Sequence, residues 1–431
     1  MKPIYNFANY KNMKFKISFG LAFLFIFNIS FSQSSVDSLM RLGNKFYKQK
    51  DFDKAASLWE QGALLVENKL SKNTNYSYAA SAYASAKDST NSFRCLELAV
   101  YKLGFNDLPS LKNDNSYEFM KSSNRWKKII KFIKPTYTTD PNKLKIIDID
   151  VRNFWKAYDL VEKDSLNAEK IYMDNYINKG TMALQYYYIN KIYNINNFVY
   201  MHNIRKRYYA TIRKNTLKAG QLKSIYQKSF VKLKQIYPQA IFPPVYFVIG
   251  KLRSAGTTSS EGLILGIDQA VMSPSADTTE LSHWEKANIS TFENLPYTVA
   301  HELIHFQQDG MASDTTLLKG AILEGMADFI GELISGKSAN ESLLIYGKGK
   351  EKEIWADFKK EMYLNRAYNW IGNGEQKDFD KPSDLGYWVG YQICKAYYEQ
   401  AKDKKKAIYE MLHIKDYKKF LEQSKLDEKL R

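Results

Sequence analysis

Two short segments of the chain carry residues that could hold a metal ion. Residues 301–305 read His-Glu-Leu-Ile-His, and Glu324 follows further along. On a helix, residues four apart project from one face, so His301 and His305 can offer two imidazole nitrogens to one metal. A catalytic zinc site takes three protein ligands and keeps one position open, and Glu324 is the natural third ligand. The pattern predicts one Zn²⁺ ion per chain.

Two further carboxylates are predicted to surround this metal. Glu302 lies about 100° around the helix from His301, where it can reach a metal-bound water without being a ligand. We therefore expect it to be a general base. Asp328 follows Glu324 by one helical turn and points to the same side. Its predicted role is to accept the hydrogen bond from the outward N–H of a ligating histidine.

The alternative is a solvated helix face, or a metal site that has decayed. The chain has only 5 histidines in 431 residues, so chance matches to this pentapeptide are expected in about a few chains per thousand. Val299, Leu303 and Ile304 predict that the helix is buried, and buried histidines and glutamates without a metal are unfavourable. These points favour the metal.

The elements that must position these residues are two helices and a small sheet. The first helix carries the pentapeptide. A second helix is predicted from apolar residues at helical spacing, namely Ala321, Ile322, Met326, Phe329, Ile330, Leu333 and Ile334. Residues 245–250 and 262–268 are β-branched or apolar runs bounded by proline or glycine, which predicts two strands.

These motifs resemble those of a known group of enzymes. His-Glu-Leu-Ile-His followed by Glu-Gly-Met-Ala-Asp at residues 324–328 is similar to the gluzincin branch of the zincin metallopeptidases. The metzincin pattern would need glycine and histidine where this chain has Gln308 and Met311. More narrowly, residues 150–425 resemble bacterial families of predicted zinc-dependent proteases of unknown function, through the two motifs and the segments 241–248, 262–266 and 385–391.

The resemblance implies an exported zinc-dependent peptidase that hydrolyses peptide bonds through a zinc-activated water, with Glu302 as its base. Tyr387 and Tyr391 are candidate donors to the oxyanion, with His413 behind them. A sheet edge is expected to hold the extended peptide or protein substrate by strand addition. The residues expected at this edge are Gly262, Leu263, Ile264, Leu265 and Gly266.

The competing hypothesis is a non-catalytic interaction or scaffold protein, in which a helical domain binds a protein partner on a zincin fold. The presence of His301, Glu302, His305 and Glu324 together favours the enzyme. The sequence does not indicate a substrate, or whether cleavage would be internal or terminal.

The predicted fold class is α+β, mostly α. Residues 1–32 are expected to be a signal peptide, residues 33–134 a helical tetratricopeptide-like domain, residues 135–147 a linker, and residues 148–431 a zincin-like domain with a small mixed sheet. Within the last domain we expect helices over 148–237, the sheet and zinc helices over 238–336, and helices again over 337–431. The helical domain either binds a partner or packs as a spacer.

The N-terminus predicts export. Lys14 and Lys16 precede an apolar stretch that ends near Ser32, which is typical of a bacterial signal peptide. We expect cleavage near Ser32, with Met13 as a second candidate start. The stretch is short for a membrane span, so no transmembrane segment is expected in the mature chain, and the alternative is an uncleaved anchor. No cysteine follows the stretch at a lipidation position, which argues against a lipid anchor.

Cysteine usage and charge add two expectations. Cys95 and Cys394 are the only cysteines, and we expect two buried free thiols, with one long-range disulfide as the alternative. The formal net charge is +17. Because no nucleic-acid-binding module accompanies it, the charge predicts a general surface property, with weak attraction to an acidic envelope, and no nucleic-acid partner.

Overall fold

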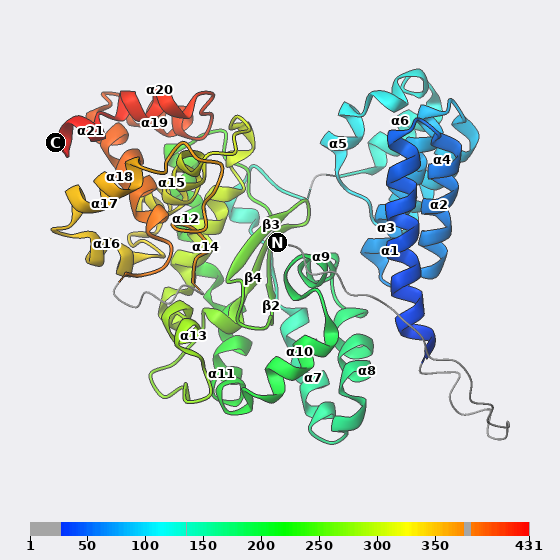
Figure 1. The fold of residues 1–431 in the computed structure, drawn as a ribbon, viewed down its shortest axis with the longest axis horizontal. Helices are drawn as coiled ribbons and strands as arrows, with labels where there is room; N and C mark the ends of the chain where they lie inside the picture. Colours follow the sequence, from blue (N-terminus) through cyan, green and yellow to red (C-terminus); the bar gives the residue numbers. More distant parts are fainter. Residues whose placement is uncertain (1–26, 135, 375–380, 431) are drawn as a thin grey trace, which may run out of the picture. The chain divides into compact units, whose positions relative to one another are not determined.

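The computed structural model describes residues 27–134, 136–374 and 381–430, and its fold is drawn in Figure 1. The chain divides into two compact units. The first unit comprises the described part of Met1–Glu67, together with Ser71–Leu103 and Asp114–Trp126. The second comprises Asn68–Leu70, Gly104–Asn113 and the described residues from Lys127 onward.

The first unit consists of packed helices. Trp59 lies between the rings of Tyr47 and Tyr78, with ring centroids 5.6 and 5.4 Å away, so one side chain joins three helices. Asp51 begins the second helix by accepting a hydrogen bond from the backbone N–H of Lys54. Its helices are α1 (Phe27–Lys48), α2 (Phe52–Leu65), α3 (Lys69–Ser85) and α4 (Ser89–Glu97), followed by the start of α6 (Asn124–Phe132), whereas α5 (Leu108–Asn113) belongs to the second unit.

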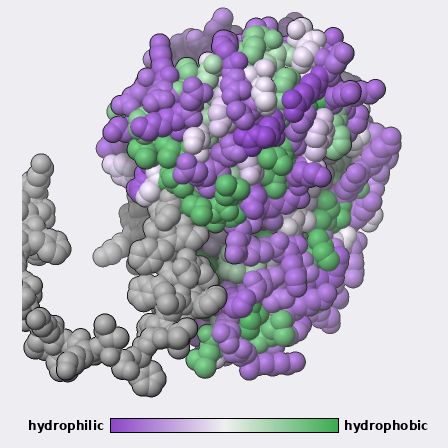
Figure 2. Space-filling view, turned by 90° about the vertical axis from the view of Figure 1, so that its right-hand side faces the viewer, coloured by the Kyte–Doolittle hydropathy of each residue, from purple (hydrophilic) through white to green (hydrophobic). Residues whose placement is uncertain are grey.

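The face of the molecule seen in Figure 2 is mainly hydrophilic. Hydrophobic side chains appear there in small separate groups within the hydrophilic surface. Single exposed apolar side chains are ordinary on soluble domains. This face therefore does not by itself indicate a partner.

The second unit contains a four-stranded mixed sheet. Its strands are β1 (Ile146–Ile147), β2 (Val245–Val248), β3 (Gly256–Ser259) and β4 (Gly262–Gly266), in the order β1-β2-β4-β3. β2 runs parallel to β1 and β4, whereas β3 pairs antiparallel with β4. Every residue of β2 and β4 is buried, as expected of continuous apolar runs covered on both faces.

This order corrects one prediction. Residues 262–266 do form a strand, but β4 lies inside the sheet between β2 and β3 and is not an edge. The edges are β1 and β3, and β3 is a polar strand of glycine, threonine and serine that carries no hydrophobic signal in the sequence. Residues 146–147, expected in a linker, form β1 and pair with Val245 and Tyr246.

The two predicted motif helices are α14 (Leu295–His305) and α15 (Leu317–Ser335). Pro296 stands in the first turn of α14, and the Thr316 hydroxyl caps the start of α15. Gly336 ends α15 in the left-handed conformation, with φ of 92°.

A third helix, α18 (Leu385–Gln400), crosses α15 with the two backbones in contact. A Cβ atom added to Gly325 would lie 2.0 Å from the backbone nitrogen of Tyr391. A Cβ atom added to Gly390 would meet the carbonyl oxygen of Ala321 just as closely. The two glycines therefore allow the crossing that fixes α15.

The remaining helices surround these elements in the second unit. Tyr176 ties this helical layer to the sheet, because its hydroxyl donates to the carbonyl oxygen of Ile249 at 2.7 Å. The helices are α7 (Ile149–Val161), α8 (Ala168–Tyr172), α9 (Met182–Tyr187), α10 (Ile195–Asn203), α11 (Lys206–Lys218), α12 (Lys223–Ile236), α13 (His283–Asn288), α16 (Glu341–Gly347), α17 (Glu351–Lys359), α19 (Lys404–Met411), α20 (Tyr417–Ser424) and α21 (Leu426–Lys429).

The coarse fold prediction is confirmed, because the chain is mostly helical with a small mixed sheet. Cys95 and Cys394 are free and buried, as predicted. Within the described residues, no helix has the length and apolar character that crossing a bilayer requires. Most of the predicted signal peptide lies outside the described residues.

Candidate metal centre

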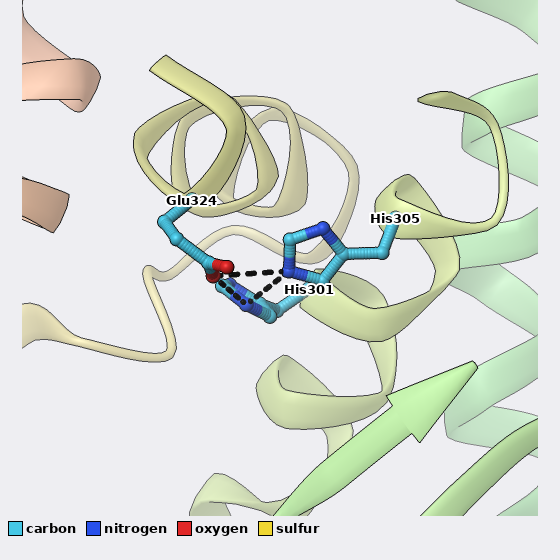
Figure 3. Close-up of side chains that lie close together, drawn as sticks. All are labelled: His301, His305 and Glu324. Carbon is cyan, nitrogen blue, oxygen red and sulfur yellow. Dashed lines mark hydrogen bonds and ion pairs between the residues drawn. The ribbon is translucent and has the colours of Figure 1, made fainter. Parts of the chain in front are cut away.

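Three side chains from α14 and α15 converge in the second unit. His301 and His305 come from one helix and Glu324 from the helix facing it, and all three point toward one another (Figure 3). The Nε2 atoms of the two histidines are 3.0 Å apart. The Oε2 atom of Glu324 lies 3.1 Å from Nε2 of His305 and 3.6 Å from Nε2 of His301.

These distances fit a single small cation. A tetrahedral zinc ion with bonds of about 2.0–2.2 Å holds its ligand atoms about 3.3 Å from one another. Within the described residues, these three form the one group of histidine, cysteine and acidic side chains close enough to share an ion. Two imidazole nitrogens and one carboxylate oxygen suit zinc, which binds nitrogen and oxygen ligands alike.

The outer nitrogen, Nδ1, of each histidine lies within hydrogen-bonding distance of a neighbouring side chain. These contacts fix the orientation of both rings and therefore the position of each inner nitrogen, Nε2. Nδ1 of His301 lies 2.8 Å from Oδ1 of Asp328. Nδ1 of His305 lies 2.7 Å from Oε1 of Gln308. If each Nδ1 carries the proton, both Nε2 lone pairs face each other and the Glu324 carboxylate. Such an arrangement is repulsive unless a proton or a metal ion lies between them.

Two residues of this outer layer were not predicted. The amide of Asn340 donates to both carboxylate oxygens of Asp328 at 3.0 Å. The amide of Gln308 donates to the carbonyl oxygen of Leu323 at 2.8 Å, so Gln308 joins His305 to α15. Gln308 could have been found from its position three residues after His305. Asn340 lies beyond the end of α15 and carries no such signal.

The pKa values of His301 and Glu324 are shifted in the directions that favour a positive charge within the cluster. Burial alone would lower the pKa of His301, but Asp328 and Glu324 outweigh it and raise that pKa well above its ordinary value. Burial would raise the pKa of Glu324, yet His305 and His301 hold it well below the usual range. Without a metal, a proton shared by these groups supplies the positive charge that the carboxylates attract.

The carboxylate of Glu302 lies against Gly256 of β3. A Cβ atom on Gly256 would overlap the Glu302 carboxylate, so the glycine leaves room for it. The side chain is only 8% exposed, and no hydrogen bond joins its carboxylate to a described residue. Burial raises the pKa of Glu302, although His305 and His301 oppose the shift.

A cleft of about 1340 Å³ opens above this cluster within the second unit. His301, Glu302, His305 and Glu324 all line it. So does every residue from Arg253 to Ser260, which includes the edge strand β3, whereas β4 does not line it. The residues predicted at the edge, 262–266, therefore lie behind the wall that faces the cluster.

The structure separates the three candidate oxyanion donors. Tyr387 lines the cleft, and its ring stacks on that of His301 with centroids 6.1 Å apart. Burial, followed by the charge of Glu324, raises the pKa of the Tyr387 hydroxyl. Tyr391 instead donates to Glu332 at 2.6 Å, and His413 contacts the Tyr409 carbonyl, both outside the cleft lining.

Comparison with known proteins decides the family. A family model described as gliding motility protein GldB matches residues 133–427, well over half of the chain. The chain belongs to the GldB family. The match begins just before β1 and covers both motif helices, so it includes the whole cluster of the second unit. None of the curated proteins and none of the solved structures matched the chain.

Membership of the GldB family corrects the predicted family and activity. The motifs favoured a zinc metallopeptidase of the gluzincin type, whereas the matched family is one of gliding motility. The assignments as enzyme, hydrolase, protease and metalloprotease are therefore wrong. The motifs specify a donor set on two helices, and such a donor set can hold a metal in proteins that differ in function. The predicted role of Glu302 as a general base was part of the peptidase prediction and is corrected with it.

Proposed function

We propose that this protein serves gliding motility as a non-catalytic interaction protein of the bacterial envelope. The observation that carries the proposal is the match of residues 133–427 to the GldB family. Membership in this family of lipoproteins also supports export. A motility component must transmit or anchor force through contacts with other proteins, and the partner-binding alternative drawn from the sequence meets that need.

The cleft above the three-ligand cluster is the proposed surface for a protein partner. It is large, and its walls include the backbone of the edge strand β3, so it offers both volume and hydrogen-bonding groups. The helical first unit is a second surface for a partner. Binding of a partner at either surface requires no cleavage of a peptide bond.

We further propose that His301, His305 and Glu324 hold one zinc ion that stabilises the floor of this cleft. A zinc ion bound by these side chains would join α14 to α15, because its ligands come from both helices. Asp328 and Gln308 would orient the two histidines. The ion would thereby fix the distance between the two helices under the cleft.

Deletion of the gene in a gliding bacterium that carries it tests the proposed function. We expect the deleted cells to grow but not to spread, and the wild-type chain to restore spreading. A chain with the exposed substitution Lys405→Gln should restore it equally and serves as the control. Normal gliding of the deleted cells, measured by tracking single cells on glass, would remove the basis of the proposal.

A further inference from the structure

The positive charge of the chain is concentrated in one stretch. Residues 175–260 contain 14 lysines and arginines and no aspartate or glutamate. The chain has 63 basic and 46 acidic residues in all, so the rest of it holds 49 basic and 46 acidic residues. Nearly all of the net charge of +17 therefore belongs to this stretch. The composition had led us to expect basic residues spread evenly over the surface, and this expectation is wrong.

Part of this charge is neutralised by carboxylates from other parts of the second unit. Arg205 forms a buried ion pair with Glu285 at 2.7 Å. Arg213 pairs with Asp159 on α7 at 2.6 Å. Lys206 and Arg207 are also paired, with Glu162 and Glu280. The paired residues are Arg205, just before α11, and three residues within the first eight positions of that helix.

The lysines further along have no such partners. Tyr226, Phe230 and Leu233 bury one face of α12, which turns the lysines of that helix outward. The turn at residues 141–143 lies beside α12, because the amide of Gln227 donates to Asn142 at 3.0 Å, and Lys145 follows this turn. Seven lysines here are exposed and make no ion pair with a described residue, and we call them the basic surface: Lys143, Lys145, Lys214, Lys218, Lys223, Lys228 and Lys232.

Apolar side chains are exposed among these lysines. Leu217 is 40% exposed and Ile225 is 43% exposed, and they lie on α11 and α12, which carry five of the seven lysines. The carboxylate of Asp148, which lies beside Gly220 between the two helices, accepts a hydrogen bond from Arg152 at 2.6 Å. Asp140 is also engaged, since it caps the turn at Asn142. Neither carboxylate pairs with a lysine of the basic surface.

We propose that the basic surface binds the anionic headgroups of a lipid bilayer. Each lysine held near an anionic membrane strengthens binding by about fivefold, so several together suffice for attachment at moderate salt. Lysine stems can extend their ammonium groups to phosphates while Leu217 and Ile225 reach the apolar boundary. A nucleic acid would use the lysines but not the apolar side chains. None of the seven lysines lines the cleft above the three-ligand cluster, so binding uses none of the proposed metal ligands.

Vesicle sedimentation with the full chain tests this proposal. Vesicles of phosphatidylcholine alone are compared with vesicles that also contain phosphatidylglycerol. We expect the protein to sediment only with the second kind, and less so as salt rises. The test variant carries Lys218→Gln, Lys223→Gln, Lys228→Gln and Lys232→Gln. The control variant has the same net charge and carries Lys402→Gln, Lys405→Gln, Lys419→Gln and Lys425→Gln, at exposed positions near the C-terminus.

The test variant should bind anionic vesicles at least about tenfold more weakly, while the control variant stays within about twofold of wild type. Both should melt at the wild-type temperature, because all the substituted side chains are exposed. Equal losses in the two variants would show that net charge alone acts and would overturn the proposal. Two further results would overturn the proposal. One is wild-type protein that sediments equally with vesicles with and without phosphatidylglycerol, and the other is wild-type protein that binds duplex DNA more tightly than anionic vesicles.

Discussion

At the scale of single residues, the molecule is defined by the convergence of two histidines and one glutamate whose inner atoms face one another. Within the folded chain this geometry is unfavourable without a cation or a proton, because Asp328 and Gln308 hold the outer nitrogens. The geometry therefore supports a metal ion shared by the three side chains, and this proposal does not depend on the function of the cleft.

Metal content tests the ligand set. We expect about one zinc ion per wild-type chain, because the site offers three ligands. Glu324→Gln should bind zinc about a hundredfold more weakly or worse, whereas Glu302→Gln should keep it, since Glu302 points toward Gly256. Elemental analysis after dialysis against zinc measures both. Wild-type protein that retains no more zinc than Glu324→Gln would exclude the site.

The outer layer gives a graded prediction. Asp328→Asn and Gln308→Ala should each weaken zinc binding by roughly 10- to 100-fold, because each loosens one ligating histidine. Competition with a coloured chelator measures the affinity. Glu332→Gln is the matched control on α15, since Glu332 bonds Tyr391 and not a ligand. A control as weak as Asp328→Asn would indicate a general effect on the helix.

At the scale of elements, the crossing of α15 and α18 depends on glycine. Gly325→Ala should lower the free energy of unfolding by about 3 kcal/mol or more, because its methyl group would overlap the backbone of Tyr391. Gly331→Ala on the same helix meets its nearest atom at 3.4 Å. That change should be neutral or stabilise by up to about 1 kcal/mol through helix propensity. Urea unfolding measures both variants, and equal effects would contradict the backbone contact.

A buried histidine supports the loop that leads to β3. Nε2 of His202 lies 2.9 Å from the carbonyl oxygen of Gly250, in a site also lined by Phe154, Phe198 and Tyr209. Burial lowers the pKa of His202 to about 3. The residue is therefore neutral in the folded state at pH values where it is protonated in the unfolded chain.

This shift predicts a loss of stability in acid. Between pH 6.5 and about pH 3 the unfolded state binds the extra proton, so the free energy of unfolding falls as pH falls, by about 5 kcal/mol at most. Urea unfolding at pH 7 and pH 4.5 should show a smaller drop for His202→Phe than for wild type. His283→Gln, at an exposed position, should behave like wild type. An unchanged drop in His202→Phe would exclude His202 as the source.

At the scale of the whole molecule, the sequence predicted the elements better than their arrangement. The apolar periodicity around His301 and Ile322 located both motif helices, because the apolar residues of an amphipathic helix recur in the sequence at the helical spacing. It did not identify β3 as a sheet edge, because the four residues of β3 carry no hydrophobic alternation, although they pair with the next strand β4 in a hairpin. Asn340 was missed because it lies beyond the end of α15 and only folding brings its amide to Asp328.

The activity was the part that the motifs could not specify. His301, His305 and Glu324 determine what can be bound, whereas the family match over residues 133–427 connects the chain to gliding. The proposed metal ligands and the predicted base can be tested separately by two conservative substitutions, Glu324→Gln at a ligand and Glu302→Gln beside it.

The gliding speed of cells carrying these two variants tests the central claim most directly. Each variant replaces the wild-type chain at equal protein level. A non-catalytic, metal-supported interaction protein predicts that Glu302→Gln cells glide at the wild-type speed and that Glu324→Gln cells do not glide. Glu302→Gln cells that stop gliding while the purified variant keeps its zinc and its fold would contradict the claim.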